Sequence, residues 1–225
     1  MDVRLLNHTP DPERAIAAAA RLCYAPVGAA ELLDAMSDDA VRKVLRTILR
    51  SGHLSALEHA SYTFAIDGVS RALTHQLVRH RLASYNQQSQ RYVKAEREAF
   101  VVPPTVLADE CASDAFDAAM RAAWESYRSL LAAGIPAEDA RYVLPNAAES
   151  KIVVTMNCRE LLHFLTLRCC KRAQWEIREL ALTMLALAEP TAPYIFMDAG
   201  AACRRGPCPE GSMTCGEPYP KAPKR

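Results

Sequence analysis

The chain has no long apolar run that would place it in a membrane. No stretch approaches the roughly 18 consecutive apolar residues of a spanning helix, and the start, Met1 to Arg4, carries no apolar signal core. Both absences favour a cytoplasmic protein with no membrane partner.

The chain also has almost no net charge. Its 27 basic residues are balanced by 26 acidic ones, and the formal net charge is +1. This balance excludes a general electrostatic field that would attract DNA or RNA, so no nucleic-acid partner is expected. The G-x-G-x-x-G fingerprint of a Rossmann dinucleotide-binding unit is absent as well.

Cysteine, in contrast, is well represented, with eight residues. In a cytoplasmic protein these favour thiols or metal ligands over a disulfide framework. Cys203, Cys208 and Cys215 lie in a proline- and glycine-rich tail, and with Cys169 or Cys170 as a fourth ligand they could hold one structural zinc ion. Their spacing lacks a C-x-x-C pair. Free thiols, or disulfides formed on oxidation, are therefore the alternative, and no metal ligand is assigned.

Helix and strand patterns alternate irregularly along the chain. At 225 residues, half of them hydrophobic, it can bury a large core in one domain, expected over residues 1–190 with a Pro/Gly/Cys-rich tail at 191–225. The absence of βαβ regularity predicts the α+β class, with a mixed or antiparallel sheet flanked by long helices. Strands are predicted over residues 2–6, 62–66, 100–102 and 151–155, a turn at 67–68, and helices over 11–23, 39–50, 113–133 and from 158 onwards.

Residues 79–92, RHRLASYNQQSQRY, carry three arginines, one histidine, two serines, one asparagine and three glutamines. A helix opened by Ser70 is predicted to extend into this segment, with Gln76, Arg79 and His80 on one polar face, before an extended loop. Arginine forks suit phosphate oxygens, and amide side chains can hydrogen-bond a pyrimidine edge. These groups favour a nucleotide pocket over the alternative, a solvated basic face or nucleic-acid patch.

The same segment is similar to the R-H-R-x-x-S-x-N-x-x-S-x-R-Y signature of flavin-dependent thymidylate synthases. All eight fixed positions match, at Arg79, His80, Arg81, Ser84, Asn86, Ser89, Arg91 and Tyr92. A signature of this length is far more specific than a lone glycine-rich loop. The stretches SGHLSALEHASYTFAIDGVSRALTHQ, ARYVLP, NCRELLHFLTLR and AQWEI continue the resemblance, which covers roughly Val3 to Pro190.

Arg168 is predicted to project from an apolar helix stripe of Leu161, Phe164 and Leu165, continued by Trp175. A cation there needs a partner, and one interpretation is a structural ion pair with a buried carboxylate. The resemblance implies another. In this family the arginine at this position acts on the uracil ring of deoxyuridylate, where a fixed cation stabilises negative charge and makes carbon C5 more nucleophilic. Arg168 is then the catalytic residue.

The resemblance also implies two groups of binding residues. For the nucleotide they are Gln76, Arg79, Gln87, Gln88, Ser89, Gln90, Arg91, Arg141 and Arg168. For FAD they are His53, Ser55, Arg79, His80, Arg81, Gln87, Asn157, Arg159 and His163, the last two at i and i+4 on one helix face. Gln87 replaces a glutamate, and His163 an asparagine, of many family members.

The reaction that the resemblance implies is reductive methylation of deoxyuridylate (dUMP) to thymidylate (dTMP). In this family 5,10-methylenetetrahydrofolate gives the carbon, NADPH reduces FAD, and FAD carries the hydride. The family assembles as a homotetramer with shared active sites. Two alternatives stay open at this point. A flavin reductase or oxidase would ignore dUMP, and a nucleic-acid-binding module would bind its partner without flavin.

Overall fold

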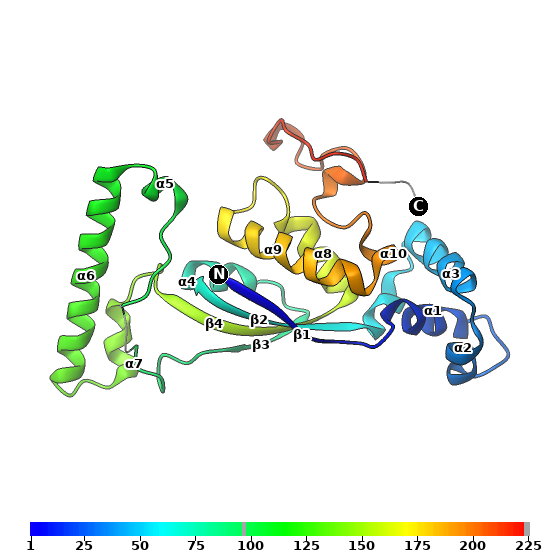
Figure 1. Ribbon diagram of the computed structural model, residues 1–225, viewed down its shortest axis with the longest axis horizontal. Coiled ribbons are helices and arrows are strands. Elements are labelled where there is room, and N and C mark those ends of the chain that lie inside the picture. The colour runs from blue at the N-terminus through cyan, green and yellow to red at the C-terminus, as the bar shows by residue number, and fades with distance from the viewer. Residues whose placement is uncertain (96–97, 223–225) are drawn as a thin grey trace. The chain divides into compact units, whose positions relative to one another are not determined.

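A computed structural model describes residues 1–95 and 98–222 of the chain (Figure 1). It divides into two compact units, each built from segments that are distant in sequence. The first unit comprises Met1–Asp2, Ile66–Arg79 and Asn86–Val153, and the second comprises Val3–Ala65, His80–Tyr85 and Val154–Arg225. The described part of the tail belongs to the second unit, while residues 223–225 of the predicted tail lie outside the described residues. The domain boundary at Pro190 stays a prediction.

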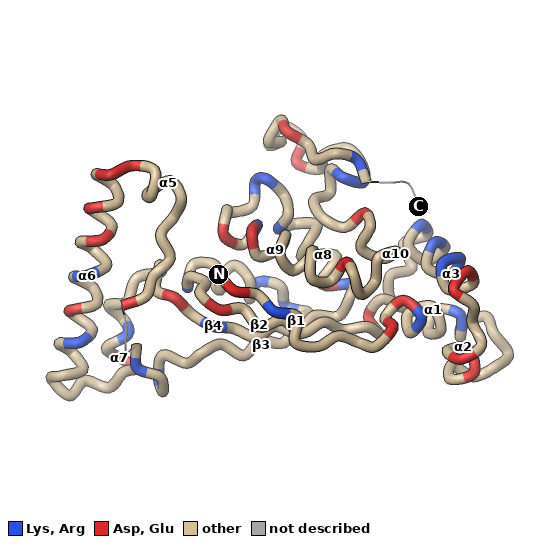
Figure 2. The backbone as a smooth tube through the Cα atoms, in the orientation of Figure 1, with Lys and Arg blue, Asp and Glu red and all other residues tan. Residues whose placement is uncertain are grey.

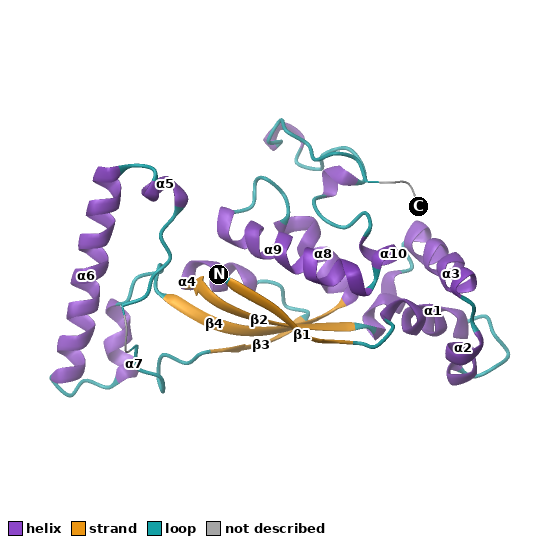
Figure 3. Ribbon diagram, in the orientation of Figure 1, coloured by secondary structure: helices purple, strands orange, loops and turns teal. Residues whose placement is uncertain are grey.

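One four-stranded antiparallel sheet has the strand order β1-β2-β4-β3 (Figure 3). Side chains of β2 are buried alternately, among them Tyr62, Phe64 and Ile66, as expected for a strand with one face against the core. Thr63 and Thr155 hydrogen-bond across β2 and β4 at 3.0 Å, which fixes the register of that pair. The α+β class is confirmed. The strands are β1 (Asp2–His8), β2 (Ser61–Ser70), β3 (Ala83–Gln87) and β4 (Glu149–Asn157).

The second unit contains most of the helices. Those predicted over residues 11–23 and 39–50 are confirmed as α1 and α3, and the helix predicted after residue 158 is α8. Helices α8 and α9 contact each other and bury Phe164 and Leu180, among other side chains. The helices are α1 (Pro12–Leu22), α2 (Ala29–Ala35), α3 (Asp38–Ser51), α8 (Cys158–Arg168), α9 (Trp175–Ala188) and α10 (Pro193–Phe196), with 3-10 helices η1 (Leu54–His59), η3 (Glu189–Thr191), η4 (Ala202–Arg204) and η5 (Gly211–Met213).

The first unit is organised around one long helix, α6, which confirms the helix predicted over residues 113–133. Its buried stripe contains Met120, Trp124 and Tyr127, and Gly134 follows it with φ +83°, a conformation that suits glycine. Figure 2 shows acidic and basic residues interspersed along α6, as in a solvated helix face. The helices of this unit are α4 (Arg71–Leu77), α5 (Pro104–Leu107), α6 (Glu110–Ala132) and α7 (Ala137–Ala140), with the 3-10 helix η2 (Arg141–Val143).

The polar segment after α4 departs from the sequence prediction. The helix opened by Ser70 ends at Leu77, so Arg79 and His80 do not share its face with Gln76. The predicted extended loop contains strand β3, and the amide of Gln88 donates to Lys151 O at 2.9 Å beside β4. Backbone pairing along a neighbouring strand outweighs the low strand propensity of these polar residues.

Three smaller predictions are also wrong. Gly68 lies inside β2 with φ +68°, because glycine tolerates this backbone conformation without ending the strand, so no turn forms there. Residues 100–102 form only an isolated bridge between Phe100 and Ala148. Trp175 begins α9 and does not continue the stripe of α8.

Within the described residues, no helix is long and apolar enough to cross a membrane.

The start of α6 provides a stability test. The Asp109 carboxylate accepts from the amide of Ala112 at 2.9 Å and thereby caps the helix. Asp109→Ala should lower the free energy of unfolding by about 1 kcal/mol, because an amide of the first turn loses its partner. Asp109→Asn keeps an acceptor and should stay near the parent. Urea unfolding at one fixed protein concentration measures both, and equal values for the two variants would contradict the capping role.

Candidate active site

Helix α8 positions the polar residues of the second unit. The side chain of Asn157 caps the helix by accepting from the amide of Glu160 at 2.9 Å, as its sequence predicts. From this start, the first turn carries the Glu160 side chain and the last residue is Arg168. Buried Leu161 and Phe164 hold the helix against the core between them. Glu160 and Arg168 therefore have a fixed separation along one rigid element.

His80 lies between these two side chains and contacts both. Its Nδ1 is 3.1 Å from Oε1 of Glu160, and its Nε2 is 3.1 Å from Nε of Arg168. A guanidinium has only donors, so Arg168 must donate to Nε2. The proton of His80 is then on Nδ1 and is donated to Glu160. The three side chains form one chain of hydrogen bonds through a neutral imidazole ring.

The surroundings of His80 keep it neutral. Burial lowers its pKa below 6.5, and the Arg168 cation and His163 act in the same direction, against the raising effect of the Glu160 carboxylate. Phe164 packs edge-on against the ring with centroids 5.0 Å apart, and Tyr85 Oη donates to the backbone oxygen of His80 at 2.8 Å. Ring orientation and protonation state are thus set together.

This arrangement has a defined pH dependence. Because the folded-state pKa of His80 lies below its ordinary value of 6.5, the unfolded chain binds a proton first as the pH falls. The stability that the neutral ring contributes is complete above that value. It decreases as the pH drops from 6.5 toward the folded-state pKa.

A pocket of about 620 Å³ lies beside α8 in the same unit. Its size is in the range typical of small-molecule and cofactor sites, which are about 300–1,000 Å³. Leucines line much of it, including Leu54, Leu57 and Leu82, and Arg159, His163 and Arg205 add polar groups. Arg159 also pairs with Glu58 at 2.5 Å. The acidic residues Glu160 and Asp198 line it as well. Largely apolar walls with a few polar groups of both charges fit an aromatic ring system with polar substituents.

The residues predicted for FAD divide between the units. His80, Arg81, Asn157, Arg159 and His163 belong to the second unit, as do His53 and Ser55 at the start of η1. Of these, Arg159 and His163 line the pocket beside α8, and Leu54 of η1 lines it too. Arg79 and Gln87 belong to the first unit.

In the first unit the Gln87 side chain is held in place by buried hydroxyl groups. Its Nε2 donates to Ser150 Oγ at 2.8 Å and to Thr74 Oγ1 at 3.1 Å. These bonds fix the end of β3, where the chain enters the segment Gln88, Ser89, Gln90 and Arg91. Ser89 Oγ accepts from the amide of Arg91 at 3.2 Å, which makes a tight local turn.

Arginines gather around α7 in this unit. Arg91 Nε is 2.6 Å from Glu138 Oε2, and Arg141 Nε donates to the backbone oxygen of Glu138 at 3.0 Å. Half-buried Arg71, at the start of α4, has its pKa lowered by burial and then by the charge of Arg141. Because the guanidiniums of Arg71 and Arg141 repel each other and Arg71 is partly buried, an anion bound between them would be stabilised. Among the described residues, neither Arg71 nor Arg141 has a carboxylate within ion-pair distance.

Sequence analysis missed Arg71 and the role of Glu160. Arg71 directly follows the N-cap Ser70, and its only sequence signal was its place at the start of the helix before the polar segment. Glu160 lies in the first turn of α8, but its carboxylate contacts His80, which lies 80 positions away in the chain. Periodicity alone cannot reveal such a contact.

The candidate metal ligands also separate into two groups. Cys169 is buried, and burial raises the pKa of its thiol to about 12. Cys170, Cys203, Cys208 and Cys215 line one pocket of the second unit. Residues 1–95 and 98–222 contain no three His, Cys, Asp or Glu side chains already arranged to hold a metal ion.

Comparison with known proteins decides the family. The family model described as "Thymidylate synthase complementing protein" matches residues 4–194. A flavin-dependent thymidylate synthase of Geobacter sulfurreducens is 60% identical over 219 residues, covering 96% of this chain and 94% of that protein. The chain belongs to the flavin-dependent thymidylate synthases. The resemblance noted in the sequence is thereby confirmed.

Other members of the flavin-dependent thymidylate synthase family are also similar. That of Clostridium tetani is 46% identical, with 96% of this chain and 93% of the relative covered. A crystal structure of the UMP/dUMP methylase PolB from Streptomyces cacaoi, bound with 5-Br dUMP, superposes with a TM-score of 0.77. It is 28% identical and covers 87% of this chain and 92% of its own. The fold is therefore shared with a nucleotide methylase.

The bond between His80 and Glu160 can be tested by titration. Glu160→Gln should lower the pKa of His80 further, because the variant removes the carboxylate that stabilises the protonated ring. Histidine NMR signals followed over a pH series measure this shift. Glu179→Gln, an exposed change on the neighbouring helix α9, should leave the signals of His80 unchanged. A raised pKa in Glu160→Gln would contradict the contact.

Proposed function

We propose that the chain converts dUMP into dTMP by reductive methylation, with 5,10-methylenetetrahydrofolate as carbon donor and NADPH-reduced FAD as hydride source. Its membership of the flavin-dependent thymidylate synthases gives the reaction class. The observation that carries the assignment to residues is Arg168, held by neutral His80 at the end of α8. A cation fixed in this way suits a reaction in which negative charge develops on a pyrimidine ring.

Arg168 is the proposed catalytic residue. Burial lowers its pKa, yet a guanidinium stays protonated in proteins. Because its Nε is bound to His80, the plane of the group is set before substrate arrives, and no reorientation is needed as charge develops. The cation stabilises negative charge on the uracil oxygen and N3, and this charge increases electron density at C5. No covalent enzyme nucleophile is required.

Flavin is the proposed occupant of the pocket beside α8. When bound, FAD supplies the hydride chemistry, while the protein orients it and excludes water. Arg159 and His163 are the proposed polar contacts from α8, with His53, Ser55, His80, Arg81 and Asn157 from the same unit. The apolar wall formed by Leu54, Leu57 and Leu82 supports this assignment, because it offers surface to an aromatic ring system.

The nucleotide phosphate is the proposed anion at the arginines of the first unit. Arg71 joins the family residues Arg91 and Arg141 in this role, and Glu138 orients the latter two. Gln76, Arg79, Gln87, Gln88, Ser89 and Gln90 complete the proposed binding set. The family precedent for shared active sites supports a homotetramer, which light scattering on the purified protein tests.

Replacing Arg168 tests the catalytic proposal. Arg168→Ala should lower kcat for dTMP formation by about 10²–10³-fold, the usual effect of removing one preorganised electrostatic group. Arg168→Lys keeps a cation without the planar fork, so its kcat should lie between that of the parent and that of Arg168→Ala. Single-turnover assays with dUMP, methylenetetrahydrofolate and NADPH measure these rates. Arg50→Ala, an exposed change on α3, is the control and should match the parent.

Two results would favour the alternatives. Bound flavin that oxidises NADPH at a rate independent of dUMP, with no dTMP formed, would indicate a flavin reductase or oxidase. Salt-dependent binding of nucleic acid without bound flavin would indicate a binding module.

Substrates with and without phosphate test the arginine site. Arg71→Ala and Arg141→Ala should each raise KM for dUMP about tenfold or more, because a charge-assisted hydrogen bond is lost. Deoxyuridine lacks the phosphate, so its already weak turnover should be the same in the parent and in both variants. Arg121→Ala, an exposed change on α6, should not affect either substrate. Equal losses with both substrates would overturn the assignment of Arg71 and Arg141 to phosphate.

A further inference from the structure

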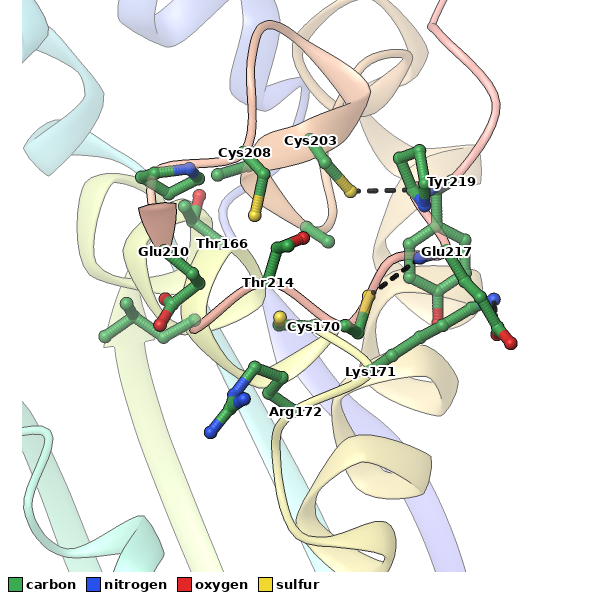
Figure 4. Close-up of a pocket in the computed structure, with 16 residues that line it drawn as sticks. Thr166, Cys170, Lys171, Arg172, Cys203, Cys208, Glu210, Thr214, Glu217 and Tyr219 are labelled. Carbon is green, nitrogen blue, oxygen red and sulfur yellow. Dashed lines mark hydrogen bonds and ion pairs between the residues drawn. The ribbon is translucent and has the colours of Figure 1, made fainter. Parts of the chain in front are cut away.

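Half of the cysteines of this chain meet at one small cavity. Cys170, Cys203, Cys208 and Cys215 line a pocket of about 80 Å³ in the second unit, between the end of α8 and the tail (Figure 4). All eight cysteines are free thiols. Cys23 and Cys111 are exposed elsewhere, and the other two are buried. Three of the four thiols come from the tail, and Cys170 comes from the loop after α8, so two distant segments of the chain meet at this cavity.

The tail that carries three of these thiols has little regular structure of its own. Between Ala201 and Tyr219 it contains only the short helices η4 and η5 within the described residues. Contacts that join it to α8 and the following loop include the ion pair of Lys171 with Glu217 at 2.9 Å, the hydrogen bond from Arg172 Nη1 to Met213 O at 2.6 Å and that from Arg205 Nη2 to Thr166 Oγ1 at 2.7 Å. These contacts are exposed, and exposed polar contacts stabilise a fold weakly. A metal ion held by the thiols would add a stronger link between the tail and this end of α8.

Two of the four sulfur atoms accept hydrogen bonds from the tail backbone. The amide of Tyr219 donates to Cys203 Sγ at 3.4 Å, and the amide of Glu217 donates to Cys215 Sγ at 3.4 Å, as the dashed lines in Figure 4 mark. Lys171 and Arg172 line the same pocket. These contacts fix the positions of Cys203 and Cys215 on the pocket wall.

We propose that Cys170, Cys203, Cys208 and Cys215 bind one structural Zn²⁺ ion. Four thiolates in tetrahedral geometry are a preferred zinc ligand set, with zinc–sulfur distances of about 2.3 Å. A cavity that exceeds the roughly 30 Å³ share of one water molecule in the liquid has room for the ion. The described residues contain no group already arranged to hold a metal ion, so binding of the ion requires the thiol side chains to rotate toward one another. Binding releases the thiol protons to solvent.

The assignment also selects between the two neighbouring cysteines of α8's C-terminal end. Cys169 is buried and does not line the pocket, whereas Cys170 does. The ion would tie the tail to a residue that follows Arg168 by two positions. Zinc is therefore a structural anchor for this end of α8 and takes no part in the methylation.

Metal analysis of the full-length protein, purified without chelator, tests the proposal. The expected result is about one zinc per chain, with Cys208→Ser and Cys215→Ser reduced to background. Cys111→Ser removes an exposed thiol on α6 and should keep the parent content. Cobalt exchanged into the protein should give the intense sulfur-to-metal absorption of a tetrahedral thiolate site, and Cys208→Ser should lose it.

Several outcomes would overturn the proposal. The first is a parent protein without zinc, in which the four thiols react freely or are joined as disulfides. The second is a parent protein that contains iron in place of zinc. The third is zinc content that stays at the parent level in Cys208→Ser. The metal content of the parent needs no variant, so a variant that fails to fold does not remove the test. Formation of dTMP is measured separately, and its presence or absence leaves the zinc result unchanged.

Discussion

The Nε2 atom of His80 can accept the Arg168 N–H only while the imidazole is neutral. If the ring were protonated, both of its nitrogens would donate and two cations would face each other. Burial and the charge of Arg168 disfavour this, while the Glu160 carboxylate accepts a hydrogen bond from Nδ1–H. The orientation of the Arg168 guanidinium, the proposed catalytic cation, thus depends on the His80 proton being on Nδ1, the ring nitrogen that faces away from Arg168.

The structure bears on both interpretations of Arg168 that the sequence allowed. A buried carboxylate is present, that of Glu160, but His80 lies between it and the Nε of Arg168. The neutral imidazole orients the guanidinium through Nε and does not itself carry a charge that would cancel the cation. This is compatible with the proposed role of Arg168 in stabilising negative charge on the pyrimidine ring.

Local sequence rules predicted the parts of the fold that depend on neighbours along the chain. Periodicity identified α3 and α6, and Ser70 caps the start of α4 as predicted. The same rules failed for β3, whose polar residues form a strand because β4 offers a backbone to pair with. They also could not place His80 beside Glu160, or Cys170 rather than Cys169 at the pocket, since these depend on which distant segments meet. Motif recognition supplied the family and the candidate site residues, whereas Arg71 became a candidate only through its electrostatic interaction with Arg141.

Strand β3 is the last strand in the sheet order, and it carries the middle of the ligand signature. An edge strand exposes backbone groups to which another chain can add, and hydrophobic edge strands promote aggregation. Ser84, Asn86 and Gln87 make this edge polar, so it is a poor template for an additional strand. Residues of the family signature on this strand therefore also disfavour pairing of the sheet edge with neighbouring molecules. Replacing Ser84 and Asn86 with apolar residues would remove this protection.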